Sequence, residues 1–490
     1  MNLDGEWWRL LPSSYSRIAY KTRWVPNVFQ ADQSRRLRVW HLGVYVAPTL
    51  SQGLSSILSL HHSEMESLIP DLSLRQPLVT PLILLFLTYY ALAVLAVLPN
   101  TFLLRLSLQP IFLWKAWRCV ADVDFAAWLA QFLGLKSAVR LHLFNSTLVV
   151  RSLAFFYHGV NVSTLTKILT QMAVSVMVLR SFEWAFIIKE PIRRYKFATN
   201  QDDPKTLKKQ FSISSVSFDA FDLLFNLRGS GWSWSPKAIP RRSTAPESIS
   251  SVVATLLFNI TVYDTAHCLM QCVFPTIGNP TGGESFFDPN LSFFPRISMA
   301  AFAGICGGVW TYSLVETLYR TATLVGRVLF RQPASDWPPV SNRPWLSTSI
   351  NEYWSIRWHQ LFRHVFITFG ARPCGALLGR PGAIMGSFAV SAILHHLCVW
   401  GLGNGHEFST AGGFFLLMGL GAIMEIVFGK VTGMRVQGFA GWLWTMSWTL
   451  MWGTLMLDGW ARLGMLANVF PDRLRPGKAL VDAIIGSPKI

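Results

Sequence analysis

The sequence predicts an all-α integral membrane protein, a polytopic bundle of about eight to ten transmembrane or re-entrant helices. Three observations support this fold class. The 490 residues are 51% hydrophobic and only 14% charged, against roughly 25% charged residues in an ordinary soluble domain. The mean hydropathy is +0.35, and apolar runs long enough to span a bilayer recur along the chain. A soluble protein could not cover that much apolar surface, whereas lipid accepts apolar side chains on every face of a helix.

The N-terminal part combines a basic segment with membrane helices. Residues 1–38 are polar and basic and lack the apolar core of a signal peptide, so the first internal helix is expected to direct insertion. Residues 39–188 are predicted to hold the N-terminal membrane helices, with clear spans at 78–98 and about 168–188. Residues 39–60 are expected to form an interfacial or short spanning helix, and 101–118 and 125–160 to form helices at the interface or packed inside the bundle.

A hydrophilic loop rich in Lys and Arg is predicted at 189–248. Residues 249–460 then form the predicted catalytic membrane domain, and 461–490 form the C-terminal tail. Within the membrane domain, spans are expected at about 250–273, 297–317, 382–402, 411–429 and 438–457.

The distribution of Lys and Arg orients these spans. It places 189–248 and 318–380 in the cytosol, and 274–295, which has no Lys or Arg, on the other side. Asn290 in that third loop begins Asn-Leu-Ser, a candidate glycosylation site. The same count places the tail outside the cytosol despite its basic residues, a discrepancy that a re-entrant or missed helix would remove. Those basic residues are Arg462, Arg473, Arg475 and Lys478.

The net charge of +17 does not indicate nucleic acid, because the Lys and Arg residues lie in loops and form no separate basic domain. Six cysteines without a CxxC pair predict no disulfide framework. Cys268 and Cys272 lie one helical turn apart beside His267, but ordinary packing is favoured over a metal site, and no metal is expected.

Two adjacent histidines lie in the apolar run at 382–402. His395 and His396 are, with Cys398, its only ionisable groups, and such groups face the bundle interior or a water-filled cavity. Adjacent helix positions differ by about 100°, so at most one ring is expected at a reaction centre. On this helix alone, a structural histidine bonded to a neighbouring helix is the preferred interpretation.

A second motif lies shortly upstream and changes that preference. It reads Tyr353-Trp-Ser-Ile-Arg-Trp-His359, and the apolar helix continues it with Ser391-Ala-Ile-Leu-His395. Two signatures precede it, Arg228-Gly-Ser-Gly-Trp-Ser-Trp234 and Asp336-Trp-Pro-Pro339. Over roughly residues 215–460, these segments resemble the wax-synthase-like branch of the membrane-bound O-acyltransferase superfamily, in particular its fungal secondary-metabolite acetyltransferases.

The resemblance implies roles for individual residues. His395 would be the general base that takes a hydroxyl proton and returns it to a leaving thiolate, and His359 would orient the thioester or stabilise its oxyanion. His396 departs from the family pattern, so either imidazole remains a candidate base, with the motif register favouring His395. Substrate contacts are expected at Trp354, Arg357, Trp358, Ser391 and His396, and coenzyme A phosphate contacts at Arg343, Arg363 and Arg372, unless these arginines only anchor the membrane surface.

The resemblance also implies an activity. The chain would move an acyl group, acetyl favoured, from acyl-CoA as co-substrate to the hydroxyl of an apolar acceptor such as a terpenoid. Direct transfer is preferred because no Ser-His-Asp set or Cys nucleophile occurs in context. No tightly bound cofactor is expected, and the partners are membrane lipid, acyl-CoA and the alcohol, in the endoplasmic reticulum.

Three alternatives stay open. One is a long-chain wax ester synthase, and another is a non-catalytic lipid-binding homologue. The third is a transporter that relays protons through its paired histidines, although the sequence has no internal repeat typical of transporters.

Overall fold

The computed structural model describes residues 80–122, 162–188, 213–229, 232, 247–405, 407–467 and 475–486. The predictions for 1–38, 39–60 and 125–160 lie outside these residues, as does most of the 189–248 loop. The described residues belong to one compact unit made of Arg75–Ser235 and Arg241–Ile490.

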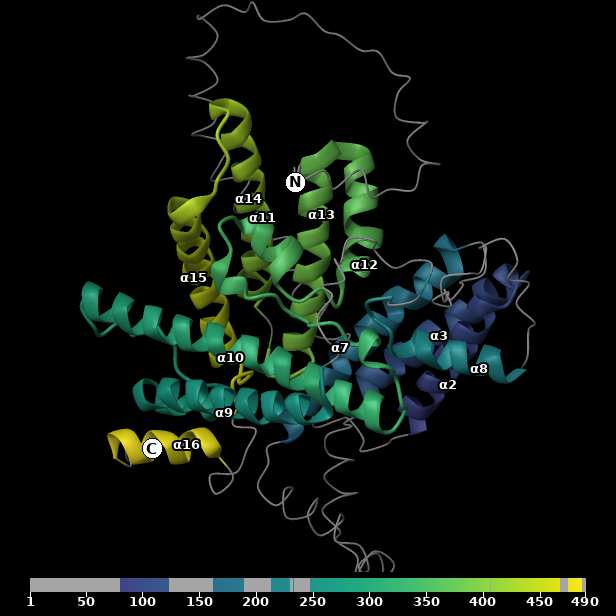
Figure 1. Cartoon of the computed structure of the whole chain (residues 1–490), viewed down its shortest axis with the longest axis horizontal. Coiled ribbons are helices and arrows are strands. Elements are labelled where there is room, and N and C mark those ends of the chain that lie inside the picture. The colour runs from purple at the N-terminus through teal and green to yellow at the C-terminus, as the bar shows by residue number, and fades with distance from the viewer. Residues whose placement is uncertain are drawn as a thin grey trace, which may run out of the picture. The chain divides into compact units, whose positions relative to one another are not determined.

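This part of the chain is helical (Figure 1), and no strand occurs among the residues just given. The longer helices are α2 (Thr80–Val97), α3 (Phe102–Asp122), α7 (Val162–Phe182), α8 (Ile213–Phe225), α9 (Ile249–Val273), α10 (Phe293–Val328), α13 (Arg372–Trp400), α14 (Phe408–Thr432), α15 (Gly438–Arg462) and α16 (Pro476–Ile485). Short helical turns connect them: η4 (Glu183–Ile187), η5 (Pro275–Gly278), η6 (Ala334–Asp336), η7 (Pro344–Leu346), α11 (Ile350–Glu352), η8 (Tyr353–Arg357), α12 (Arg363–Phe366) and η9 (Ile367–Ala371).

Five helical segments are long and apolar enough to cross a bilayer, and they confirm the all-α polytopic membrane class. They are Thr80–Val97, Ile249–Val273, Phe293–Val328, Arg363–Trp400 and Phe408–Thr432. Each overlaps a predicted span. Beyond these five, α7 and α15 form where two further spans were predicted and are 21 and 25 residues long.

The predicted 318–380 loop is shorter in the structure. Helix α10 continues to Val328 because Arg320, which looked like a loop charge, lies on the helix and pairs with Glu316 and Glu247 at 3.4 and 2.5 Å. At the other end, α12, η9 and the start of α13 are helical from Arg363 onwards. The connecting segment is therefore confined to about 329–362.

Helix α13 is broken at Gly379, whose φ of 64° is readily adopted only without a Cβ. The turn lets α12 and η9 pack against the longer arm of α13 (Figure 1). There Gly370 and Gly386 bring the two backbones together, since a Cβ on Gly370 would lie 2.2 Å from the Gly386 carbonyl oxygen. The long arm carries the paired histidines.

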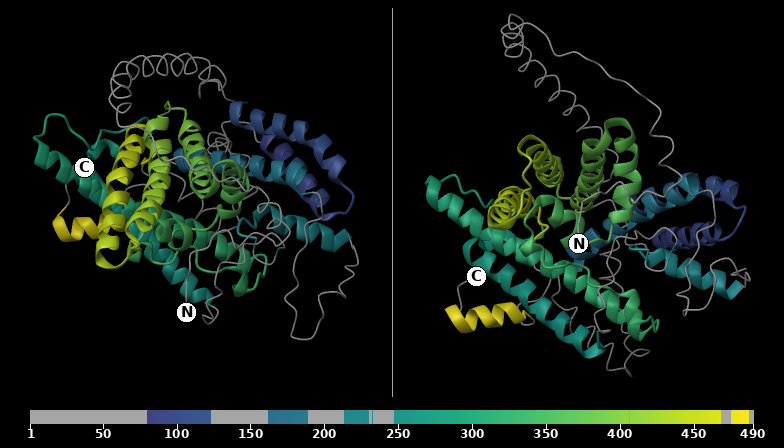
Figure 2. Two further views of the ribbon diagram at one scale, coloured as in Figure 1. Left: turned by 90° about the horizontal axis from the view of Figure 1, so that it is seen from above. Right: turned by 45° about the horizontal axis from the view of Figure 1, so that its top comes forward.

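Two hydrophobic clusters stabilise this unit. One gathers buried side chains of α2, α3, α7 and α8, and the other those of α9, α10, α13, α14 and α15. Helix α9 runs along α10, and the amphipathic α16 packs on α9 (Figure 2).

Candidate active site

The short helix α11 and the π-helical turn η8 carry the upstream motif. Ser349 caps α11, its hydroxyl accepting the N–H of Glu352 at 3.0 Å, and the Glu352 carboxylate accepts the N–H of Thr348 at 2.8 Å. This reciprocal arrangement is close to a capping box. Arg357 ends η8 and donates to the same carboxylate at 2.6 Å, so side chains of the motif segment itself hold both of its ends.

The Trp354 indole lies among aromatic rings. Its Nε1 is buried without a hydrogen-bond partner, and its environment is apolar. The ring centroids within 6 Å on α13 and α14 belong to Phe388 at 5.8 Å and to Phe414 and Phe415, both at 5.9 Å. Trp354 thus joins the upstream motif to the helix of the paired histidines and to its neighbour α14.

The His395 ring is held in one tautomer. Its Nδ1 lies 2.9 Å from the backbone oxygen of Ser391, and because a carbonyl oxygen only accepts, Nδ1 carries the hydrogen. In the neutral ring, Nε2 then has the free lone pair. The Phe415 ring lies 4.2 Å from the imidazole, between centroids. His395 therefore faces the rings that surround Trp354, and buried Ser391 contributes its backbone carbonyl.

His359, which follows η8, lies close enough to His395 for their charges to interact. Its ring is 5.4 Å from Trp358 and 6.0 Å from Phe362, between centroids, and Trp358 in turn stacks on Tyr353 at 5.7 Å. Its Nδ1 is buried without a hydrogen-bond partner. Burial, with the neighbouring His395 ring and the positive charge of Arg228, lowers the pKa of His359 to about 3, so its ring is neutral near pH 7.

His396 faces another direction, as the helix geometry requires. It is buried, and its ring contacts Phe408 at 5.2 Å and Trp400 at 6.5 Å, between centroids. The structure therefore brings His395, His359, Trp354 and Trp358 together through one aromatic cluster, with His396 on a separate face of α13.

The four predicted arginines differ in their surroundings. Arg357, besides Glu352, lies 3.3 Å from the Asn342 carbonyl oxygen, and Arg363 donates to the Ser355 carbonyl at 3.1 Å. Both bond to the motif segment itself. Arg343 and Arg372 are exposed. The predicted glycosylation site, Asn290, is also exposed, in the turn before α10.

A buried pair ties this segment to the N-terminal helices. His364 on α12 hydrogen-bonds the carboxylate of Glu183, the first residue of η4, and both side chains are less than a tenth exposed. Because His364 follows His359 by five residues, the contact restrains His359 from the side of η4.

The C-terminal arginine that conflicted with the charge distribution is buried. Arg475 pairs with Asp264 on α9 at 2.8 Å and donates to Gln271 at 2.7 Å. His267, the centre of the weak metal pattern, has both ring nitrogens engaged, with the Leu466 carbonyl at 2.6 Å and Arg475 at 3.3 Å. Arg475 is thus neutralised by an internal carboxylate, so the positive-inside tendency does not apply to it.

Arg228 belongs to one of the sequence signatures, but the sequence predicted no role for it. In the structure it is buried and donates to the Pro338 carbonyl at 2.7 Å, in the Asp336-Trp-Pro-Pro signature. Phe415, against His395, was missed, since an apolar helix offers no local signal for one ring among many.

Part of the chain is similar to a known protein family. Residues 337–417, which include both histidine motifs, match the model of the membrane bound O-acyl transferase family. An O-mevalon transferase of Aspergillus niger is 23% identical over 246 residues, 46% of this chain and 53% of that protein. An acetyltransferase of Aspergillus fumigatus is 25% identical over 269 residues, 47% of this chain and 61% of that protein.

A plant protein is also similar. A long-chain-alcohol O-fatty-acyltransferase of Simmondsia chinensis is 26% identical over 110 residues, 21% of this chain and 31% of that protein. The chain therefore spans between about a third and three fifths of the length of these three relatives.

Proposed function

We propose that this chain, a member of the wax-synthase-like branch of the membrane-bound O-acyltransferase superfamily, transfers an acyl group from acyl-CoA to the hydroxyl of an apolar acceptor. One observation carries the proposal. The histidines of the two motifs lie at the two ends of one aromatic cluster, His359 against Trp358 and His395 against Phe415, and the bond from His395 Nδ1 to the Ser391 carbonyl leaves Nε2 as the basic atom.

The chemistry follows from that tautomer. The acceptor oxygen attacks the thioester carbonyl carbon while Nε2 of His395 takes the hydroxyl proton, and the carbonyl π electrons move onto oxygen. When the tetrahedral intermediate collapses, the C=O bond reforms and the C–S bond breaks, with its electron pair leaving on sulfur. The proton then passes from His395 to the thiolate, giving the ester, free coenzyme A and the original imidazole.

His359 is suited to a different task. Its low pKa keeps the ring neutral, and a neutral imidazole carries one N–H that can donate to the developing oxyanion or to the thioester. The aromatic rings around Trp354 limit water near His395, which favours the alcohol over hydrolysis of the thioester.

For the donor we favour acetyl-CoA, and for the acceptor a terpenoid or other secondary-metabolite alcohol. The support is that fungal relatives of this chain are named acetyltransferases. The endoplasmic reticulum is the proposed location. The match to the Simmondsia chinensis protein favours a second candidate within the same reaction class, a long-chain wax ester synthase.

The test uses microsomes that contain the parent chain, His395→Ala or His396→Ala at matched protein levels. Each receives radiolabelled acetyl-CoA or palmitoyl-CoA with a panel of terpenoid and fatty alcohols. Ester formed by the parent and reduced about 100-fold or more in His395→Ala supports the proposal, because general-base catalysis contributes about 10²–10⁴-fold.

The same experiment can overturn parts of the proposal. Full activity in His395→Ala with loss in His396→Ala would move the base to His396. Absence of ester in the parent with every donor and acceptor would count against the acyltransferase and favour the transporter or the lipid-binding homologue.

A further inference from the structure

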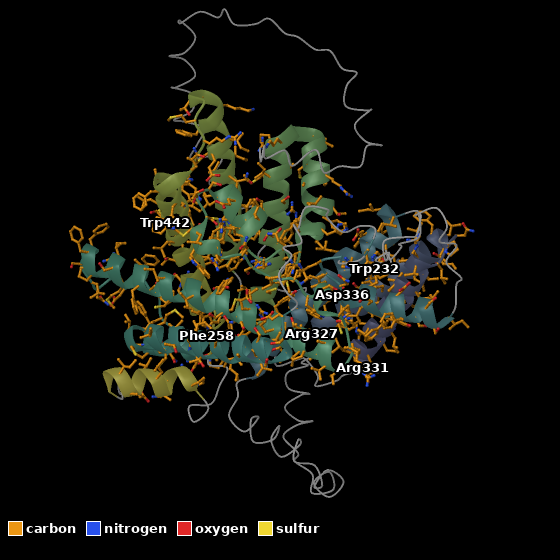
Figure 3. The ribbon with its side chains drawn as sticks, in the orientation of Figure 1. Trp232, Phe258, Arg327, Arg331, Asp336 and Trp442 are labelled. Atoms are coloured by element: carbon orange, nitrogen blue, oxygen red, sulfur yellow. The ribbon has the colours of Figure 1, made fainter. Side chains whose placement is uncertain are left out.

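Arg228 connects two sequence signatures that are far apart in the chain. It lies in the loop after α8 and is 8% exposed. Its Nη1 donates to the carbonyls of Pro338 and Pro339 at 2.7 and 3.2 Å and lies 3.3 Å from the Tyr319 hydroxyl. Trp232 and Asp336 mark the two signature segments in Figure 3. The guanidinium is thus fixed by neutral oxygens on the segment that leads into the histidine motif.

The charge of Arg228 is not balanced by these contacts. Within the part of the chain that the structure describes, no carboxylate pairs with it, and its Nε is buried without a hydrogen-bond partner. By contrast, Arg475 pairs with Asp264 and Arg320 with Glu316. Burying a cation is destabilising unless an anion accompanies it. Arg228 is therefore suited to an anionic ligand.

The position of Arg228 relates that ligand to the reaction. Its positive charge acts on His359. A buried guanidinium whose charge reaches His359 can attract negative charge that arrives with, or develops on, a molecule bound beside that histidine. The hydrogen bonds that a guanidinium donates are shorter and stronger when the acceptor oxygen is anionic than when it is neutral.

We propose that Arg228 binds an anionic oxygen of the acyl thioester. This inference rests on the proposed function and adds a donor-binding residue to it. The oxygen has two possible sources with the same chemistry. One is the thioester carbonyl oxygen, which becomes negative when the alcohol adds to the carbonyl carbon and returns to a carbonyl when the C–S bond breaks. The other is a phosphate of coenzyme A, which is negative throughout.

Two donors distinguish these sources. Parent, Arg228→Gln and Arg228→Lys membranes are assayed with acetyl-CoA and with the acetyl thioester of N-acetylcysteamine, which has no phosphate. If Arg228 binds a phosphate, Arg228→Gln raises KM for acetyl-CoA tenfold or more and leaves the phosphate-free donor unaffected. If it binds the oxyanion, Arg228→Gln lowers kcat tenfold or more with both donors.

Matched variants separate binding from folding. Arg331→Gln removes an exposed arginine and should change neither donor's kinetics. Tyr319→Phe removes a hydroxyl that contacts Arg228 and the Pro338 carbonyl but keeps the charge, so it should lower the melting temperature with less than a threefold effect on kcat/KM. A purely structural role for Arg228 predicts equal losses in Tyr319→Phe and Arg228→Gln.

Arg228→Lys keeps the inference testable if Arg228→Gln does not accumulate. Lys lacks the planar fork of Arg, so we expect kcat/KM to fall at least threefold, with the same dependence on donor. Unchanged kinetics with both donors, in variants that accumulate normally, would refute a role for Arg228 while leaving the acyltransferase intact. A parent that makes no ester with either donor would instead refute the proposed function.

Discussion

The carboxylate of Glu425, on α14, accepts a hydrogen bond of 2.6 Å from the backbone N–H of Ile350, the first residue of α11. Its second oxygen accepts the N–H of Asn351 at 3.1 Å, and the Trp444 indole on α15 donates at 3.0 Å to the same oxygen as Ile350. A negative side chain at a helix N-terminus satisfies donors that the helix itself leaves unpaired. Glu425 thereby anchors the motif segment to the membrane helices.

We expect Glu425→Ala to displace that segment. It leaves two partly buried N–H groups without their acceptor, at a cost of about 1–3 kcal/mol each, and should lower both the melting temperature in detergent and kcat. Trp444→Phe removes one donor to the carboxylate and leaves the two N–H bonds, so its effect should be clearly smaller. Equal effects of the two variants would contradict an anchoring role for Glu425.

The pH dependence of stability should report on His359. Its pKa of about 3 in the folded protein lies below the value of about 6.5 expected when unfolded, so the folded state binds fewer protons between these values. Its contribution is complete above pH 6.5 and is lost on acidification, by about 2 kcal/mol at pH 5. His359→Gln should therefore show a smaller fall in melting temperature between pH 7 and pH 5 than the parent. An equal fall would contradict the burial of a neutral ring.

The ion pair of Arg475 and Asp264 should contribute strongly to the stability of the C-terminal segment. Breaking a buried pair by removing one partner costs about 3–5 kcal/mol, so Arg475→Met should lower the melting temperature and speed proteolysis of α16. The double change Arg475→Met, Asp264→Asn should recover part of the loss. Lys478→Met, which removes a more exposed pair with Asp482, should have little effect. If α16 of Arg475→Met were digested at the parent rate, the ion pair would not stabilise the C-terminal segment.

The close approach of η9 to α13 should be sensitive to one methyl group. In Gly386→Ala the new Cβ would lie 2.4 Å from the Gly370 carbonyl oxygen and 2.7 Å from Cys374 Sγ, so the helices must separate at a cost of about 1–3 kcal/mol. Gly413→Ala on α14 meets nothing within 4 Å and should be neutral or slightly stabilising. Melting temperatures of the two purified variants provide the comparison.

Hydropathy predicted the position of the five long apolar helices, because a membrane span is recognised from its local composition alone. The continuation of α10 past Arg320 was not predicted. One partner carboxylate, Glu316, lies one helical turn away, but the other, Glu247, is 73 residues earlier in the chain. Arg475 was misleading for the same reason, since a charge in a tail and a charge buried against Asp264 look identical in sequence.

In the candidate active site, too, features set by local sequence were predicted and features set by distant contacts were not. The spacing of the motifs pointed to His359 and His395, and helix geometry separated His395 from His396. The sequence could not indicate which arginine lies near His359. Arg228 precedes His359 by more than a hundred residues, and only the folded chain brings its charge to that ring.

The bond between Arg475 and Asp264 also bears on how the chain is made. Asp264 precedes its partner by 211 residues, so during synthesis α9 must exist with an unpaired acidic group until nearly all of the membrane helices have been translated. Contacts of such separation form late, because the intervening chain must first be ordered. Docking of α16 on α9 is therefore a closing step of assembly, and a chain interrupted before residue 475 would expose an uncompensated carboxylate to cellular quality control.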